Sequence, residues 1–200
     1  TGNITQGVAL TIGGTSAFIT SASNADIALT TTTNAFTGTV SFTTAGTNGD
    51  VTVVDASGLD LAASTVGGNL TATAATGNME DSGVLTIAGT SSFTTSATDA
   101  TITLNNANAF TGAVSLNTTG SSGNATVVDA SGLDFGASTV GGTLSATATT
   151  GDISDSGNLA IIGAATFITV ADGSDIVLDS SGNAFSSWVK MEADDGSEAF

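Results

Sequence analysis

The 200-residue sequence contains no cysteine, histidine, proline, arginine or tyrosine, and Lys190 is its only basic residue. Without histidine and cysteine, the sequence cannot form a Ser-His-Asp triad, a cysteine nucleophile or a zinc site of the usual ligand types. A single lysine cannot neutralise a phosphate backbone or an anionic membrane surface, so nucleic-acid binding is excluded. Disulfides are also excluded, so packing and backbone hydrogen bonds must stabilise the chain.

What the sequence does contain is acidic, small and β-branched. Eighteen acidic residues give a net charge of −17, while threonine occupies 37 positions and glycine 26. The chain is nevertheless 40% hydrophobic, with a mean hydropathy of +0.33, which argues against disorder. No apolar run approaches the ~18 residues of a membrane span, so we expect no membrane insertion. The sequence that starts at Thr1 has no basic region followed by an apolar one, so we expect any signal peptide to lie outside this segment.

Internal repeats dominate the sequence. Val54–Asp60 reads Val-Asp-Ala-Ser-Gly-Leu-Asp and recurs at Val128–Asp134, a shift of about 74 residues, which is typical of a repeat architecture. Asn-Ala-Phe occurs at 34–36, 108–110 and 183–185. These offsets predict long repeats over residues 2–76 and 77–150, with a partial copy over 151–185.

Phenylalanine spacing predicts a shorter period within each long repeat. Phe18 and Phe36 are 18 residues apart, which divides the long repeat into about four coils and the chain into about eleven. Residues one period apart should lie above one another, so six phenylalanines are predicted to stack inside the core. They are Phe18, Phe36, Phe93, Phe110, Phe167 and Phe185.

Local patterns predict an all-β chain. Segments such as Leu10–Ile12, Ile27–Leu29 and Val51–Val53 alternate apolar and polar residues and are separated by glycine, asparagine and aspartate. An antiparallel sandwich does not need a repeated sequence, whereas a solenoid is built from sequence repeats. We therefore predict a parallel β-helix (β-solenoid) of single-stranded type, right-handed because parallel crossovers overwhelmingly take that hand.

The repeats resemble those of filamentous-haemagglutinin-type adhesins. The resemblance lies in Gly2–Gln6, Ala9–Thr15, Asp26–Leu29, Asn34–Ser41 and Val66–Ala74, and it covers residues 2 to about 185. Adhesins of this type are large surface proteins of Gram-negative bacteria, and their repeats form a right-handed β-helical stalk. The resemblance therefore implies an extracellular or cell-surface location, but it implies no ligand.

The carboxyl-terminal segment departs from the repeat pattern. The solenoid is predicted over residues 1–185. Residues 186–200 hold the only tryptophan, Trp188, and the only lysine. We predict that this segment is a cap, a junction or a docking segment.

Four aspartates are candidates for metal binding. Asp55 with Asp60, and Asp129 with Asp134, flank an Ala-Ser-Gly-Leu turn, and carboxylates at turns could ligate Ca²⁺. The spacing matches no known calcium loop, so the alternative is a structural turn built from aspartate and glycine. We expect no other cofactor.

The predicted function is mechanical and not enzymatic. The chain should be a stalk segment of a secreted or surface-bound adhesin, whose partners are a host or neighbouring cell surface. The main alternative is a filament subunit that joins copies of itself end to end. Less favoured are a polysaccharide-active enzyme using paired carboxylates and an ice-binding protein using Thr-x-Thr triplets such as 71–73 and 147–149.

Overall fold

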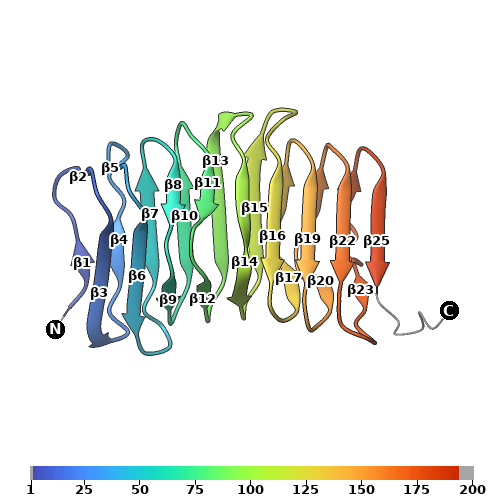
Figure 1. The fold of residues 1–200 in the computed structure, drawn as a ribbon, viewed down its shortest axis with the longest axis horizontal. Helices are drawn as coiled ribbons and strands as arrows, with labels where there is room; N and C mark the ends of the chain where they lie inside the picture. Colours follow the sequence, from blue (N-terminus) through green and yellow to red (C-terminus); the bar gives the residue numbers. More distant parts are fainter. Residues whose placement is uncertain (1, 194–200) are drawn as a thin grey trace.

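The computed structural model describes residues 2–193, which form an elongated stack of short β-strands with the first and last strands at opposite ends of the stack (Figure 1). All strand pairings within these residues are parallel. No helix in this part of the chain is long and apolar enough to cross a membrane.

Two long sheets run the length of the stack, and a small third sheet lies near its amino-terminal end. Sheet 1 comprises β1 (Ile4–Thr5), β4 (Ile27–Leu29), β7 (Val51–Asp55), β10 (Leu70–Ala74), β13 (Ser91–Thr98), β15 (Val114–Thr119), β17 (Leu133–Phe135), β18 (Ser138–Val140), β20 (Ile153–Asp155), β21 (Leu159–Ile161), β23 (Ile176–Val177) and β24 (Ala184–Phe185). Sheet 2 comprises β3 (Ser16–Ser23), β6 (Val40–Ala45), β8 (Leu59–Leu61), β9 (Ser64–Val66), β11 (Met79–Asp81), β12 (Leu85–Ile87), β14 (Ile102–Phe110), β16 (Ala125–Asp129), β19 (Leu144–Ala148), β22 (Ala165–Thr169) and β25 (Val189–Ala193). The third sheet pairs β2 (Thr11–Ile12) with β5 (Ala35–Phe36).

The all-β parallel solenoid is confirmed, but the predicted coil length and coil number are wrong. The main path of sheet 1 passes through nine strands, one per coil, instead of eleven. Register offsets between coils range from about 19 residues, between Val51 and Leu70, to about 24, between Ile27 and Val51. The 18-residue spacing failed because the phenylalanines it joins occupy different positions of their coils. The right-handed sense stays a prediction.

The long repeat contains a half-integral number of coils. β7 lies in sheet 1, whereas β16, its counterpart in the next long repeat, lies in sheet 2. Three coils separate β7 from β15 along sheet 1, and β16 follows half a coil further on. Each long repeat is therefore about three and a half coils, and it rotates the next copy by half a turn about the long axis.

A single apolar core fills the space between the sheets. Inward residues alternate with outward ones along each strand, as in β7, where Val51, Val53 and Asp55 are buried and the residues between them are partly exposed. Inward valine, leucine, isoleucine, alanine and phenylalanine side chains form one continuous cluster from the second coil to Phe167. Because each coil covers the core of its neighbours, burial is nearly complete away from the two ends.

The phenylalanines contact one another in a different geometry from the predicted vertical stack. Phe18 pairs in register with Phe42, and their rings stack at 5.9 Å. The Phe18 and Phe36 rings instead meet edge to face, with centroids 6.0 Å apart. Phe93 meets Phe110, and Phe167 meets Phe185, in the same edge-to-face manner. These contacts are favourable, but they join neighbouring strands across the core, not equivalent positions of successive coils.

Turns at the corners recur with the long repeat. Asn24, Asp99 and Gly173 share one position and all have positive φ (59°, 66° and 76°). Gly46 and Gly120 share another, with φ of 86° and 82°. Buried threonine hydroxyls close these turns by donating to carbonyl oxygens five residues on, as Thr44 does to Gly49 at 2.9 Å. The same bond is made by Thr20, Thr95, Thr118 and Thr169.

The solenoid continues beyond the boundary expected at residue 185. β25 pairs with β22 residue by residue, from Ala165 opposite Val189 to Thr169 opposite Ala193. Residues 189–193 are therefore part of the last coil, and they add a strand to sheet 2. Residues 194–200 of the segment expected at 186–200 lie outside the described residues.

One glycine pair limits how closely coils can stack, and this gives a testable prediction. A methyl group on Gly67 would collide with the Gly46 carbonyl oxygen in the coil below, whereas one on Gly13 would meet no atom within 4 Å. Gly67→Ala should therefore lower the free energy of unfolding by about 1–3 kcal/mol through overpacking, while Gly13→Ala should change it little. Urea unfolding of both variants measures the difference, and equal effects would contradict this close packing.

Candidate functional site

The four aspartates proposed as metal ligands are distributed between the two sheets. Asp55 ends β7 in sheet 1, and Asp60 lies in β8 of sheet 2. In the next repeat the sheets are exchanged, with Asp129 in sheet 2 and Asp134 in sheet 1. Within residues 2–193, no three acidic, histidine or cysteine side chains converge as a metal-binding group would. The Ca²⁺ site stays a prediction, and the contacts of these carboxylates give them a structural role.

Asp55 and Asp129 are fully buried and accept hydrogen bonds from the backbone. Asp55 accepts the Phe36 N–H at 2.8 Å, and it accepts both the N–H and the hydroxyl of Ser57, at 2.7 and 2.8 Å. Asp129 makes the same three contacts with Phe110 and Ser131. Each carboxylate therefore holds its own turn and a strand of the preceding coil. This explains why the Asp-Ala-Ser-Gly motif recurs.

A buried asparagine lies beside each of these carboxylates and connects three coils. Asn108 is fully buried, pairs in register with Asp129, and accepts the Leu85 N–H at 2.8 Å. Its amide donates to Asp81 at 2.7 Å. Asp81, Asn108 and Asp129 thus form one unit, which we call the polar spine. Its equivalents are Gln6, Asn34 and Asp55 in the first repeat and Asp155 with Asn183 in the third.

The polar spine satisfies nearly every polar atom that it buries. Asp81 also accepts the backbone N–H groups of Asn105 at 2.9 Å and Asn106 at 3.3 Å, where β14 departs from regular register. In the first repeat Gln6 takes the place of Asp81 and contacts Asn34 through both amide atoms. Unpaired buried polar groups cost about 1–3 kcal/mol each, so the spine favours one register of coil on coil over all shifted ones.

A second polar ladder lies on the outer corner of the solenoid. The side-chain oxygens of Asn3, Asp26, Asp50 and Asn69 each accept a backbone N–H one coil further on, at 2.7–3.0 Å. The series ends at Thr90, whose N–H Asn69 binds. Many of the acidic residues therefore make, at the corners, the hydrogen bonds that the strands do not make there.

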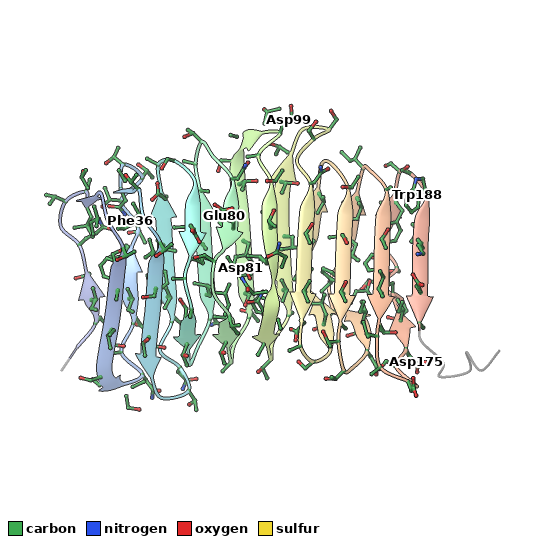
Figure 2. All side chains as sticks on the ribbon, in the orientation of Figure 1. Phe36, Glu80, Asp81, Asp99, Asp175 and Trp188 are labelled. Atoms are coloured by element: carbon green, nitrogen blue, oxygen red, sulfur yellow. The ribbon has the colours of Figure 1, made fainter. Side chains whose placement is uncertain are left out.

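One groove on the described surface, of about 320 Å³, is acidic. Asp60 and Glu80 lie side by side on neighbouring strands at its wall, and Phe36, Leu59 and Asn78 complete much of the lining. Figure 2 labels Phe36 and Glu80. Adjacent like charges repel, and a cation would relieve that repulsion. In the second repeat Ser154 replaces Glu80 opposite Asp134, so the carboxylate pair is not a repeated feature.

The outward faces of the long strands carry columns of hydroxyl groups. On sheet 1, Thr52, Thr71, Ser92 and Ser115 lie in register, and Thr73 and Thr94 form part of the adjacent column. On sheet 2 the column contains Thr103, Thr126, Ser145 and Thr166. The sheet 2 column continues into Glu80 beside Thr103 and into Lys190 beside Thr166, and in both sheets threonine alternates with serine and other residues. A regular Thr-x-Thr array would need both columns to be threonine in every coil.

Sequence reasoning missed the polar spine and the outer ladder. Asn34, Asn108 and Asn183 were visible as part of the repeated Asn-Ala-Phe motif, and Asp81 and Asp155 are separated by the length of one long repeat. That shared spacing was the available signal. What the spacing could not show is that asparagine points inward, because a solvated turn explains a lone asparagine equally well.

Loss of one hydrogen-bond acceptor from the polar spine should destabilise the fold. Asp129→Asn keeps the shape of the side chain but places an NH₂ group against one of the N–H donors of Phe110 or Ser131. The free energy of unfolding should fall by about 1–3 kcal/mol. Asp172→Asn, at an exposed turn, is the matched control and should stay within about 0.5 kcal/mol of wild type. Urea titration at neutral pH measures both, and a silent Asp129→Asn would contradict the structural role.

The same carboxylate should make stability depend on pH. Burial raises the pKa of the Asp129 carboxyl above its ordinary value of 3.8, although hydrogen bonds from Ser131 and Phe110 oppose the shift. The folded state then holds its proton more tightly than the unfolded state, so the contribution is complete below pH 3.8 and is lost as pH rises through the folded pKa. The stability difference between wild type and Asp129→Asn should therefore shrink from acid to neutral pH. A difference that grows instead would show that the pKa is lowered.

Comparison with protein families identifies the repeat. Residues 1–43, 48–117 and 122–192 match a model described as "Repeats of unknown function (DUF5649)". The three matches end at 43, 117 and 192, and this spacing confirms the long repeat that the sequence predicts. Comparison with curated proteins and with solved structures gave no match. Since the family model covers most of the sequence, the chain belongs to the family of DUF5649 repeats.

Proposed function

We propose that this chain is a structural spacer in a secreted or cell-surface bacterial protein of the adhesin type. The observation that carries the proposal is the continuous coil-on-coil pairing of strands, which both sheets maintain from the first coil to the last. The resemblance of the repeats to filamentous-haemagglutinin-type stalks supports the location. Adhesion to a host or neighbouring cell would belong to other parts of such a protein, which the spacer holds away from the cell.

The contacts described above suit a spacer. Nine coils at the strand spacing of about 4.8 Å give a rod roughly 40 Å long. The polar spine and the outer ladder join neighbouring coils at defined atoms, so these coils resist sliding. The polar groups with the most specific contacts, Asp55, Asn108 and Asp129, bind their own backbone and are unavailable to a substrate.

The acidic surface has a role in the same proposal. Excess negative charge keeps repetitive rods soluble and discourages side-by-side pairing of strands. Asp26, Asp50 and Asp99 lie at corners, where their charge reaches solvent around the rod. Figure 2 shows Asp99 at one edge of the molecule and Asp175 at the opposite edge. Rods in parallel array would therefore repel one another through their edges.

A spacer should change length, and not activity, when one repeat is removed. Deletion of residues 48–121 joins Thr47 to Ser122, which is the repeat equivalent of Asn48. The shortened chain should fold cooperatively and be about 17 Å shorter, because three and a half coils are lost. Small-angle X-ray scattering measures the length. Deletion of only residues 48–65, the 18-residue period, is the control and should prevent proper folding because it breaks the register.

Location and role are tested in cells that make the parent protein. Protease treatment of intact cells should release fragments containing this segment. The 48–121 deletion should reduce attachment without abolishing it. A segment protected inside intact cells would overturn the proposed location. Loss of a measurable chemical activity on deletion, with attachment unchanged, would overturn the spacer role.

A further inference from the structure

One turn of the solenoid contains a chemically reactive pair of residues. Asn48 precedes Gly49 in the turn between β6 and β7, and it is the only asparagine in the chain that is followed by glycine. Because glycine has no Cβ atom to shield its backbone nitrogen, the side chain of a preceding asparagine can react with that nitrogen. In the second long repeat the equivalent residues are Ser122 and Gly123. The reactive pair is therefore specific to one turn.

Both reacting groups are free of hydrogen bonds. The Asn48 side chain is exposed, and within residues 2–193 it makes no hydrogen bond. The Gly49 N–H also has no acceptor in this part of the chain. The second repeat differs, because the Gly123 N–H donates to the Gly120 carbonyl at 3.1 Å. Reaction at Gly49 therefore breaks no hydrogen bond, whereas the same reaction at Gly123 would break one.

We propose that Asn48 is a site of spontaneous deamidation, and that the isoaspartate formed there weakens the contact between two coils. The Gly49 nitrogen loses its proton to hydroxide and attacks Cγ of Asn48. The bond from Cγ to Nδ2 then breaks, ammonia leaves with a proton from water, and a five-membered succinimide remains.

Water completes the reaction by adding to either carbonyl of the succinimide. Cleavage of the bond between Cγ and the Gly49 nitrogen gives aspartate. Cleavage of the bond between that nitrogen and the backbone carbonyl carbon of residue 48 gives isoaspartate. Each complete reaction consumes one water molecule and releases one ammonia, so no enzyme, oxidant or other reactant is required.

The carbonyl group that follows Asn48 connects its coil to the next one. The Gly49 carbonyl accepts the Thr44 hydroxyl at 2.9 Å and the Gly68 N–H at 3.0 Å. The Thr44 hydroxyl oxygen in turn accepts the Gly67 N–H at 2.9 Å. The position of Gly49 therefore determines whether three hydrogen bonds at this corner form.

The turn accommodates aspartate but has no space for isoaspartate. Aspartate keeps the backbone unchanged and adds a charge at an exposed position. Isoaspartate passes the backbone through the side chain and inserts an additional atom between the Asn48 N–H, which Asn24 holds at 3.1 Å, and Gly49. A Cβ atom on Gly49 would already lie 2.8 Å from Cβ of Thr44 and 3.0 Å from the Ala25 carbonyl oxygen. The additional atom must therefore displace the Gly49 carbonyl and break its hydrogen bonds.

Three variants of the full-length chain test the site. Asn48→Ser copies the residue found at position 122 and should abolish deamidation at this turn. Ser122→Asn creates a second Asn-Gly pair, in which the Gly123 N–H is bonded. It should deamidate roughly two- to tenfold more slowly than Asn48, because one hydrogen bond must open first. In concentrated urea the two sites should react at similar rates. Asn48→Asp introduces the charge alone.

Mass mapping of peptides after incubation in mildly alkaline buffer locates the deamidated residues, and labelling by an isoaspartate methyltransferase measures isoaspartate. Wild type should deamidate at Asn48 before any other asparagine, and faster as pH rises, since the deprotonated Gly49 nitrogen is the nucleophile. Wild type that contains isoaspartate should unfold at a lower urea concentration than fresh wild type. Freshly prepared Asn48→Asp should unfold at the same urea concentration as fresh wild type.

Three outcomes would overturn the proposal. They are deamidation of another asparagine before Asn48, equal rates at Asn48 and in folded Ser122→Asn, and unchanged urea unfolding of the form that contains isoaspartate. The proposal goes beyond the spacer role and does not rest on it. Its failure would leave the deletion and cell-surface tests of the spacer unaffected.

Discussion

The structure depends on one constraint, which is that every coil must exchange its backbone hydrogen bonds with the coils above and below. Parallel strands about 4.8 Å apart accept no other arrangement. An inward residue is therefore packed chiefly by its register neighbours, as Phe18 is by Phe42. Coils nevertheless differ in length by several residues, as the offsets from Val51 to Leu70 and from Ile27 to Val51 show. The turns absorb this variation, because only the strands must keep register.

Where strands end, side chains supply the hydrogen bonds that the backbone makes within the strands. Threonine hydroxyls close the corner turns, the outer ladder binds corner N–H groups, and the polar spine binds those inside. This division explains why a chain so poor in basic residues can bury carboxylates. Asp81, Asp129 and their equivalents are balanced by N–H donors, not by cations. The acidic composition thus reflects two different uses, one internal and one at the surface.

The all-β class, the parallel stacking and the long repeat could be predicted because they follow from identities between distant segments and from alternation along strands. The coil length could not. Phe18 and Phe36 recur at a fixed distance, but one belongs to β3 and the other to β5, and only coordinates distinguish a register partner from a neighbour across the core.

The roles of single polar residues were predicted only in part. The structural alternative for the motif around Asp55 agrees with the hydrogen bonds that its carboxylate accepts from Ser57. The burial of Asp55 was not anticipated, since an aspartate near a glycine is usually solvated. Trp188 and Lys190 appeared to lie outside the repeat because their side chains differ from those in earlier copies. Their backbone keeps the register of β22 regardless of side-chain identity. Strand pairing tolerates such changes on an outward face or at an open end.

The extra half coil in each repeat determines which residues the rod presents on each of its sides. Val54–Asp60 and its copy Val128–Asp134 face opposite sides of the rod, because their strands lie in exchanged sheets. In an array of such repeats, each side would show the same epitope once every seven coils, about 34 Å apart. A flat surface could engage one row and leave an identical row facing outward. A rod built in this way has no front or back, and it could bridge two like surfaces without turning.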